Sequence, residues 1–402
     1  MTANAFDYLV IGAGIVGLTT ALELKKRFPT ATIAILEKEA EVGLHASGRN
    51  SGVMHSGVYY GNSTLKAKVC SVGAQRMREF AAEHQIACHK TGKVIIATSE
   101  RDLPTIERLM KNAQDNHVRA ELLTESEIKK IEPYASPYKL GIYSPDTAVI
   151  DSKAVIRKLF EMLTKYGSIF FFNSKDIAYD SEKKALKING KQISYGFLFN
   201  CAGAGADLVA KQFGLAQDYT LVPFKGIYYK VRAERDYLVK SNIYPVPDID
   251  LPFLGVHLTR VVSGDIYVGP TAIPALGREN YGILKGVEFK ESFKIGKDLI
   301  SMYLENKQNF RLLVHTEVKK YLKPWFVQAA QKLMHDIQSD DLVPSDKVGI
   351  RPQLINNKTK TLEMDYILQG TESSLHVLNA ISPAFTSSFA FAEFIVDTAN
   401  IN

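Results

Sequence analysis

The stretch FDYLVIGAGIVGLTTALELKKRFPTATIAILEKE, residues 6–39, predicts the fold of this chain. An apolar strand over residues 8–11 meets a glycine-rich turn, a helix follows, and a second apolar strand over residues 32–36 ends at Glu37. This order is typical of a βαβ unit that binds a dinucleotide. We therefore expect a nucleotide site here, rather than a glycine-rich turn without a ligand.

The glycines and the acid have distinct places in the predicted site. Gly12 makes the tight turn, Gly14 lets the backbone approach a pyrophosphate, and Gly17 lets the helix pack closely on the sheet. The helix N-terminus offers unpaired N–H groups to phosphate. Glu37 is placed to accept hydrogen bonds from a ribose diol. The nucleotide contacts predicted for this unit are Gly12, Gly14, Ile15, Val16, Gly17, Glu37 and Lys38.

The composition is that of an ordinary globular protein. The chain has 402 residues, 46% of them hydrophobic, which is enough for two or three structural units. Its formal net charge of +6 is modest and its charges are interspersed, so nothing indicates a nucleic-acid surface, and the mild positive field fits an anionic small substrate equally well. Cys70, Cys88 and Cys201 form no disulfide framework, which favours a reducing compartment. Neither the cysteines nor the histidines show metal-binding spacing, so no metal site is predicted.

The sequence carries no segment that would span a membrane. The N-terminus shows no secretory signal, and no apolar run reaches the roughly 20 residues needed to cross a bilayer. We expect a cytoplasmic protein, with peripheral contact to the inner face of the membrane left open. Residues 315–338 mix basic residues with Tyr321, Trp325 and Phe326 at near-helical spacing, and Pro324 is expected to begin a new helix. A surface helix packing an apolar stripe is preferred here over a membrane contact.

Two further strand-turn-helix crossings lie far from the first. Strand 197–200 runs through a small-residue turn into a helix, and strand 376–379 runs through a loop into the last helix. Such crossings imply a domain assembled from discontinuous segments. The stretches between them are rich in Val, Ile and Tyr, as is typical of strands in another sheet. The predicted domains are a nucleotide-binding domain over 1–84, 145–215 and 340–402, and a substrate domain over 85–144 and 216–339.

The loop after the second strand indicates which nucleotide is bound. Residues 45–67, HASGRNSGVMHSGVYYGNSTLKA, enter the space beside the pyrophosphate, and their small side chains let a flat ring lie against the backbone. A nicotinamide enzyme has no evident need for such a loop, whereas an FAD enzyme must hold an isoalloxazine ring, so FAD is the predicted cofactor. Its further predicted contacts are Ser47, Arg49, Asn50, Ser51, Gly52, Ile177, Cys201, Ala202, Gly203, Arg351, Ser382, Pro383, Ala384, Phe385 and Thr386.

A series of motifs runs through nearly the whole chain. They are GAGIVGLTTALEL (12–24), SGRNSGVMHSGVYY (47–60), TLKAK (64–68), YVGPTAIPALGRENY (267–281), DLVPSDKVGIRPQL (341–354) and LHVLNAISPAFTSSFAFAEFIV (375–396). Through them the sequence resembles the D-amino-acid-oxidase-like superfamily of FAD oxidoreductases and, within it, the L-2-hydroxyglutarate oxidase/dehydrogenase family. The resemblance implies an α/β fold with a discontinuous Rossmann-type FAD-binding domain. It also implies an inserted α+β substrate domain built on a mixed or antiparallel sheet.

The same resemblance implies an activity. It is oxidation of an L-2-hydroxy acid, foremost L-2-hydroxyglutarate to 2-oxoglutarate, by hydride transfer to flavin N5, with reoxidation by oxygen or a quinone-linked acceptor. The alternatives on this scaffold are oxidation of glycerol 3-phosphate or of a small amino acid. Outside the enzyme class, a flavin-binding module without turnover is a further alternative.

Two residues are predicted to carry the chemistry. Oxidising a secondary alcohol requires a base near the flavin, and His55 follows the flavin loop and matches the family's motif histidine. A carboxylate substrate needs a fixed cation, and Arg351 aligns with the arginine that the resemblance places above the flavin. The alternatives are a histidine that only hydrogen-bonds the flavin or stabilises the turn, and an arginine that pairs with an internal acid or contacts the flavin.

Other residues are weaker candidates. The loop Ser382–Thr386 precedes a helix whose positive end could stabilise charge on reduced flavin, or it simply caps that helix. Tyr59, Tyr60 and Tyr228 are candidates to line the substrate cavity, and Tyr60 and Tyr228 are predicted to contact substrate, although tyrosines on strands more often serve packing. Lys225 and Arg278 are candidates for the distal carboxylate of a diacid, and solvated charges are the more ordinary interpretation.

Overall fold

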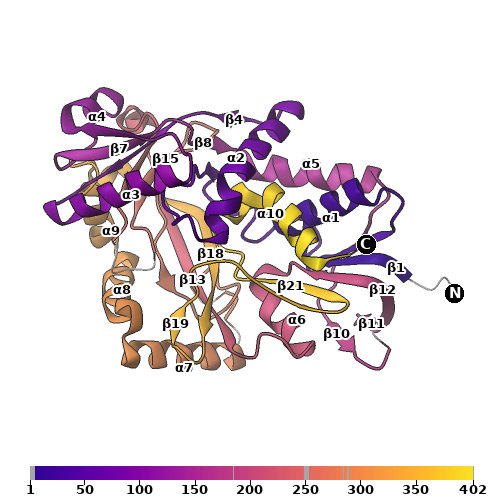
Figure 1. The fold of residues 1–402 in the computed structure, drawn as a ribbon. Coiled ribbons are helices and arrows are strands. Elements are labelled where there is room, and N and C mark those ends of the chain that lie inside the picture. Colours follow the sequence, from indigo (N-terminus) through magenta and orange to yellow (C-terminus); the bar gives the residue numbers. More distant parts are fainter. Residues whose placement is uncertain (1–4, 184, 249–252, 284, 288, 402) are drawn as a thin grey trace.

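The computed structural model describes residues 5–183, 185–248, 253–283, 285–287 and 289–401. The strands in these residues form three sheets, and Figure 1 shows the first two side by side, with the N-terminal β1 and the C-terminal α10 in the same half of the molecule. The small third sheet, β3-β8-β4, is antiparallel throughout. Its strands are β3 (Val53–Met54), β4 (Cys88–His89) and β8 (Ala148–Ile150).

The first sheet is the predicted nucleotide-binding sheet. Its centre is parallel, with β1 between β12 and β2, β9 beyond β2, and β21 beside the C-terminal half of β12. Two antiparallel hairpin strands, β10 and β11, extend it. Its strands are β1 (Ala5–Ile11), β2 (Ile33–Leu36), β9 (Ile169–Phe171), β10 (Ile177–Asp180), β11 (Ala185–Ile188), β12 (Lys191–Asn200), β20 (Ile367–Thr371) and β21 (Ser374–Leu378).

The apolar side chains of β1 point alternately to the two faces of this sheet. Tyr8 and Val10 belong to a core that includes residues of the helices on one face, whereas Leu9 and Ile11 pack with the β10–β11 side. Successive side chains of a strand point to opposite faces, so an apolar strand such as β1 requires cover on both. The helices of this half are α1 (Ile15–Arg27), α2 (Leu65–Glu83), α5 (Ser152–Lys165), α6 (Ala206–Gln212) and α10 (Ala384–Ala399).

The second sheet is mixed, as predicted for the substrate domain. Its strand pairs are antiparallel except for β14 and β5, which are parallel. Together with the first sheet it confirms the predicted fold class. Its strands are β5 (Lys93–Ile96), β6 (Glu121–Thr124), β7 (Leu140–Ser144), β13 (Tyr219–Val231), β14 (Asn242–Pro245), β15 (His257–Arg260), β16 (Ile266–Gly269), β17 (Ile273–Pro274), β18 (Leu342–Asn356) and β19 (Thr361–Leu362).

Helices cover the outer parts of this sheet. Phe326 and Val327 of α9 enter the core formed with the strands, and Pro324 lies in the first turn of α9, as the sequence predicts. Ile295 and Met302 of α7 pack in a core with Phe224 of β13. These helices are α3 (Leu103–Asp115), α4 (Glu125–Ile131), α7 (Phe289–Glu305), α8 (Phe310–Val318) and α9 (Lys323–Gln331). The 3₁₀ helices among the described residues are η1 (Glu100–Asp102), η2 (Gly203–Gly205), η3 (Ala233–Leu238), η4 (Lys307–Asn309), η5 (Lys319–Tyr321) and η6 (Ser339–Asp341).

One strand lies elsewhere than the sequence suggested. β18 pairs with β13 from Leu342 to Asn356, within the second sheet, whereas the sequence assigned 340–402 to the nucleotide-binding domain. The pairing joins segments more than 100 residues apart, and no local pattern encodes such a partner. The domain boundaries themselves stay a prediction. Across the described residues, no helix is long and apolar enough to cross a membrane.

Candidate active site

A single large cavity collects most of the predicted site residues. It has a volume of about 1310 Å³, larger than the roughly 300–1,000 Å³ of an ordinary ligand pocket, so it has room for a dinucleotide together with a small substrate. It is lined by the loops that follow β1, β2 and β12 and by β13, β15 and β18 of the second sheet. Every predicted cofactor contact lines it except Gly17 and Gly52, and so do His55, Tyr60 and Tyr228.

The turn after β1 is built from backbone that only glycine tolerates. Gly12 has φ of +101°, and a Cβ there would lie 2.5 Å from the carbonyl oxygen of Cys201. A Cβ on Gly17 would collide with the carbonyl of Gly12. Gly12 therefore makes the turn, and Gly17 lies behind the cavity wall, where it lets α1 pack closely on β1.

Glu37 and Ser47 are fixed beside the N-terminus of α1. The Glu37 carboxylate accepts hydrogen bonds from the backbone N–H of Ala13 (2.9 Å) and of Glu39 (3.0 Å). Ser47 Oγ accepts from the N–H of Ile15 at 2.9 Å. Since the N-terminus of a helix favours negative charge, this corner of the cavity suits a phosphate with a ribose beside it.

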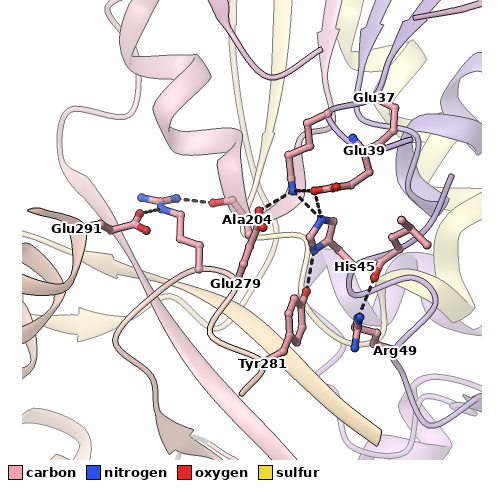
Figure 2. Close-up of polar contacts among 11 residues, drawn as sticks. Glu37, Glu39, His45, Arg49, Ala204, Glu279, Tyr281 and Glu291 are labelled. Atoms are coloured by element: carbon pink, nitrogen blue, oxygen red, sulfur yellow. Dashed lines mark hydrogen bonds and ion pairs between the residues drawn. The ribbon is translucent and has the colours of Figure 1, made fainter. Parts of the chain in front are cut away.

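Residues 38–49 are linked to residues 279–281 by polar contacts (Figure 2). Lys38 Nζ contacts His45 Nε2 at 2.6 Å and Glu279 Oε1 at 2.5 Å, and it is also paired with Glu39. His45 Nδ1 lies 2.8 Å from the Tyr281 hydroxyl. Glu39, His45 and Glu279 could together offer three ligand atoms to a metal, but the Lys38 ammonium contacts all three and its charge opposes a cation there. We therefore read the cluster as the wall that closes the nucleotide end of the cavity.

The two basic residues suggested for a distal carboxylate have internal partners instead. Arg278 pairs with Asp207 and Glu291 and donates to the carbonyl of Ala204. Lys225 donates to the carbonyl of Gly282 at 2.7 Å and is absent from the cavity wall. The Arg278 charge is therefore balanced by acids of the protein, and the Lys225 ammonium is hydrogen-bonded to a backbone carbonyl outside the cavity wall.

His55 lies in the cavity beside the loop that precedes α10. Its Nε2 is 3.3 Å from Ser382 Oγ, and its backbone N–H donates to Thr386 Oγ1 at 3.2 Å. Its Nδ1 is buried and has no hydrogen-bond partner in the described residues. Burial lowers the pKa of His55 to about 3, and the charges of Lys93, His257 and Arg351 contribute in the same direction. The imidazole is therefore neutral at physiological pH and able to accept a proton.

Arg351 carries an uncommitted positive charge into the same cavity. It lies on β18 opposite Phe224 of β13, and its guanidinium sits 4.8 Å from the centre of the Phe253 ring. Within the part of the chain that the structure describes, the Arg351 guanidinium has no hydrogen bond or ion pair to protein. Burial lowers the pKa of Arg351, as expected for a cation held away from water.

The sequence reading missed a second cation of the cavity, Lys66. It lies in the first turn of α2, is only 6% exposed, and lines the cavity without a hydrogen bond or ion pair from its ammonium to any described residue. Burial lowers the pKa of Lys66 to about 7, and the charge of Arg351 also lowers it. A signal was present in the sequence, because Lys66 shares the buried side of α2 with Cys70 and Gly73, where a charged residue is unusual.

An aromatic wall, also largely missed, faces His55. Tyr244 stacks on His257, with ring centres 3.9 Å apart, and both line the cavity. Behind them, the fully buried Lys93 lies 4.5 Å from the Tyr59 ring and 5.0 Å from the Tyr244 ring, and its ammonium has no hydrogen-bond partner in the described chain. These residues come from separate strands and loops, so no local pattern groups them.

A family profile described as FAD dependent oxidoreductase matches residues 7–398. The L-2-hydroxyglutarate dehydrogenase of Indibacter alkaliphilus is 36% identical over 98% of both chains. The mitochondrial L-2-hydroxyglutarate dehydrogenase of Homo sapiens is 33% identical over 98% of this chain and 89% of that protein.

Solved structures share the fold at lower identity. The FAD-bound L-alpha-glycerophosphate oxidase of Mycoplasma pneumoniae has a TM-score of 0.77 at 20% identity, covering 99% of this chain and 95% of that one. Glycine oxidase from Geobacillus kaustophilus has a TM-score of 0.73 at 16% identity, with the same coverage.

The residues present fit the cofactor that these proteins imply. The turn at Gly12 and Gly14 keeps side chains away from the N-terminus of α1, and Glu37 stands where a ribose would lie. The loop Ser382–Thr386 lines the cavity at the N-terminus of α10, whose positive end would face a reduced flavin. The chain belongs to the FAD-dependent oxidoreductase family.

Proposed function

We propose that this protein oxidises L-2-hydroxyglutarate to 2-oxoglutarate. The curated relatives named above carry this activity in their names and match the chain over almost its whole length. The single observation in the structure that carries the proposal is the pair of cations in the cavity wall, Arg351 and Lys66, which form no ion pair with a described residue. A cavity with this charge favours a dianionic diacid over an ammonium-bearing amino acid.

Arg351 is assigned to the carboxylate next to the reacting carbon. Its planar guanidinium can donate two parallel hydrogen bonds to one carboxylate, which fixes the orientation of the adjacent C–OH group. The absence of a protein partner for this guanidinium in the described residues leaves it free for that contact. Lys66, a buried cation of the wall without an ion pair to a described residue, is assigned to the second carboxylate.

His55 is assigned as the base that takes the hydroxyl proton at Nε2. This nitrogen faces the cavity loop at Ser382, whereas Nδ1 is buried behind it. A bound carboxylate neutralises Arg351 and so removes one of the charges that hold the pKa of His55 low, which makes the imidazole a stronger base once substrate is present. FAD, when bound, supplies the acceptor for the hydride of the substrate C–H bond.

The apolar and aromatic wall completes the arrangement. Phe253, Tyr244 and Tyr228 line the cavity and are buried, so they exclude water from the space beside His55. A water-poor site strengthens the attraction between the substrate carboxylates and the cavity cations. Tyr60 lies in the same wall, where burial raises its pKa well above the ordinary value, and its neutral hydroxyl is a donor for the substrate.

The electron acceptor is proposed to be oxygen or a quinone-linked carrier. Reoxidation is a separate half-reaction, so the identity of the acceptor does not alter the roles assigned above. Measuring turnover of the reduced protein with oxygen alone and with a soluble quinone analogue distinguishes the two acceptors.

The proposal is tested by anaerobic mixing of the purified holoprotein with a panel of substrates while flavin absorbance is followed. The panel contains L- and D-2-hydroxyglutarate, L-lactate, glycerol 3-phosphate and glycine. We expect fast bleaching with L-2-hydroxyglutarate, much slower bleaching with the monoacid lactate, and none with glycine. Faster bleaching by glycerol 3-phosphate or glycine would contradict the substrate assignment, and bleaching by no compound would favour a non-catalytic flavin module.

A further inference from the structure

Three buried polar atoms near the proposed base have no hydrogen-bond partner among the described residues. They are Nδ1 of His55, the Tyr59 hydroxyl and Nζ of Lys93. The Lys93 ammonium lies 4.5 Å from the centre of the Tyr59 ring, and its charge acts on the pKa of His55. Buried polar atoms are nearly always paired, either with protein or with ordered water, so each exception requires an explanation. Three exceptions in one neighbourhood indicate a common explanation.

Lys93 lies on the face of β5 that packs against Tyr59. Val94 and Ile96 enter the core shared with α9, whereas Ile95 belongs to the cluster that Tyr59 packs against. Because successive side chains of a strand point to opposite faces, Lys93 shares the face of Ile95. Lys93 is 0% exposed, and a lysine is almost never fully buried unless its charge is paired. Since Lys93 forms no ion pair with a described residue, its burial points to a function.

A row of polar side chains crosses the second sheet at the level of Lys93. On one side, Ser144 of β7 is the cross-strand partner of Lys93. On the other side, Asn242 of β14 lies level with Lys93, and Thr259 of β15 is the cross-strand partner of Asn242. Asn242 Oδ1 and Thr259 Oγ1 are also buried without a partner in the described chain. A buried polar region of this kind is where ordered water binds, because each water can join two to four such atoms.

The polar row (Lys93, Ser144, Asn242 and Thr259) is connected to the base through Ser56. Ser144 Oγ is 2.8 Å from Oγ of Ser56, and Ser56 follows His55 directly. The other titratable groups that face Lys93 or His55 are Tyr59 after β3, Cys70 of α2, Tyr244 of β14, His257 of β15 and Arg351 of β18. No described carboxylate contributes to the pKa of Lys93 or of His55, so the charged form of Lys93 lacks an acid to stabilise it.

The protonation states of the two groups favour transfer of a proton from His55 to Lys93. Nε2 of His55 can take the hydroxyl proton only when Nδ1 carries the proton of the neutral ring, and Nδ1–H is then a donor in the buried polar region. Burial lowers the pKa of His55 to about 3, so the imidazole alone holds a second proton weakly. Burial lowers the pKa of Lys93 only to about 7, so a neutral lysine amine holds that proton more strongly.

We propose that Lys93 is a positioning residue for the base and, through buried water, receives the Nδ1 proton of His55 during the oxidation. As the substrate O–H bond breaks, its proton binds Nε2, the N–H bond at Nδ1 breaks, and a proton is added to the neutral Lys93 amine. His55 is left neutral with its proton on Nε2, and Lys93 is left as an ammonium, which releases the proton before the next turnover. The electron pair of the substrate C–H bond leaves with the hydride, as in the proposed function, on which this inference rests.

The first test is Lys93→Met, which keeps the length of the side chain but cannot bind a proton. Anaerobic flavin reduction in the holoprotein by L-2-hydroxyglutarate is expected to slow about ten- to a hundredfold. The substrate concentration that gives half-maximal reduction and the FAD content should stay close to wild type, because Lys93 does not line the cavity. Lys90→Met, at an exposed lysine of the same segment, is the matched control and should reduce at the wild-type rate.

The pH profile distinguishes proton transfer from packing. In the wild type, the limiting reduction rate at saturating substrate should rise with pH up to about 7 and then level, because only the neutral amine can accept the proton. Saturating substrate is used because Lys66, which titrates in the same range, then stays charged against the bound carboxylate. The rise should be absent from Lys93→Met.

Thermal unfolding supplies a measurement that is independent of turnover. The pKa of Lys93 is lower in the folded protein than in the unfolded chain, so the lysine costs stability below its unfolded pKa of about 10.4, and the cost grows as pH falls toward about 7. Lys93→Met should therefore raise the melting temperature at pH 7, and this gain should shrink as the pH approaches 10. A lysine that serves only to pack on the tyrosine rings predicts a loss of stability with unchanged reduction, and that result overturns the proposal.

The variants also separate this inference from the proposed function. Slow reduction by His55→Ala together with wild-type reduction by Lys93→Met overturns proton transfer to Lys93 and leaves the base assignment intact. Wild-type reduction by both variants overturns both assignments. A slow Lys93→Met variant whose limiting rate still rises up to pH 7 also overturns proton transfer to Lys93, because another group must then be titrating.

Discussion

The two ends of the cavity differ in how their charged groups are partnered. At the nucleotide end, Lys38 and Arg278 are neutralised by acids of the protein, and both oxygens of Glu37 accept backbone N–H groups. At the substrate end, the side chains of Arg351 and Lys66 form no ion pair with any described residue. The charged side chains at the nucleotide end are therefore already paired within the protein. Those at the substrate end are available to pair with a ligand.

The paired nucleotide end of the cavity is thus structural, and the unpaired substrate end is the reactive part. A buried cation without an anion costs stability, so its retention points to a functional contact. Such groups cluster around His55 and are separated in sequence by hundreds of residues. Changes at the substrate end should therefore alter turnover while FAD stays bound. A change at the nucleotide end should instead weaken the binding of FAD.

The largest effect is expected from His55→Ala. Removing a base that takes the hydroxyl proton should slow flavin reduction by about 10²–10⁴-fold. FAD content should stay close to wild type, because His55 contacts the cavity loop rather than the dinucleotide end. Stopped-flow reduction and the ratio of flavin to protein absorbance measure the two quantities. His89→Ala, at an exposed histidine, serves as the control, and normal reduction by the His55 variant would refute the assignment.

Arg351→Lys is expected to have the next largest effect. Lysine keeps the charge but cannot donate two parallel hydrogen bonds, so the variant should lose about 2 kcal/mol of substrate binding, roughly a thirtyfold rise in KM, with a smaller change in kcat. Steady-state kinetics with L-2-hydroxyglutarate separate the two constants. Unchanged kinetics would mean that Arg351 does not bind the substrate.

Local patterns explain why the nucleotide end could be predicted. The glycine turn, the small-residue turn at Cys201 and the acid after β2 are each encoded within a few residues, and all line the cavity or support it as expected. The fold class followed from the same crossings. Their geometry is dictated by backbone constraints that sequence spacing expresses directly.

The substrate end required the tertiary structure. β18 brings Arg351 to the cavity by pairing with β13, and His257 and Tyr244 stack across neighbouring strands, contacts that spacing does not reveal. Lys66 lies between these two cases. Its place on the buried side of α2 can be predicted from the sequence, but its lack of an ion-pair partner cannot. Lys225 and Arg278 were proposed for their charge alone, and the structure shows that each already has a partner.

The pH dependence of kcat/KM should report the charge state of Lys66. A free lysine with a pKa of about 7 is charged below that pH and neutral above it, so kcat/KM for the dianion should fall as pH rises through about 7. We expect Lys66→Gln to lower kcat/KM about tenfold at pH 6 and to remove the pH-dependent fall, and Lys66→Arg to retain high activity above pH 7. The exposed Lys68→Gln, two residues along the same helix, is the matched control. A fall that persists in the Gln and Arg variants would assign the titration to another group.

The smallest effect is expected from Glu37→Gln, at the opposite end of the cavity. The amide oxygen can still accept one of the two backbone N–H groups, but a hydrogen bond to a neutral acceptor is weaker by about 1 kcal/mol, which corresponds to about a fivefold weaker affinity for FAD. Titration of the apoprotein with FAD measures this, and KM for substrate at saturating FAD should be unchanged. A raised KM with normal FAD affinity would show that the two ends are coupled, because a residue of the nucleotide scaffold would then be acting on the unpartnered charges around His55.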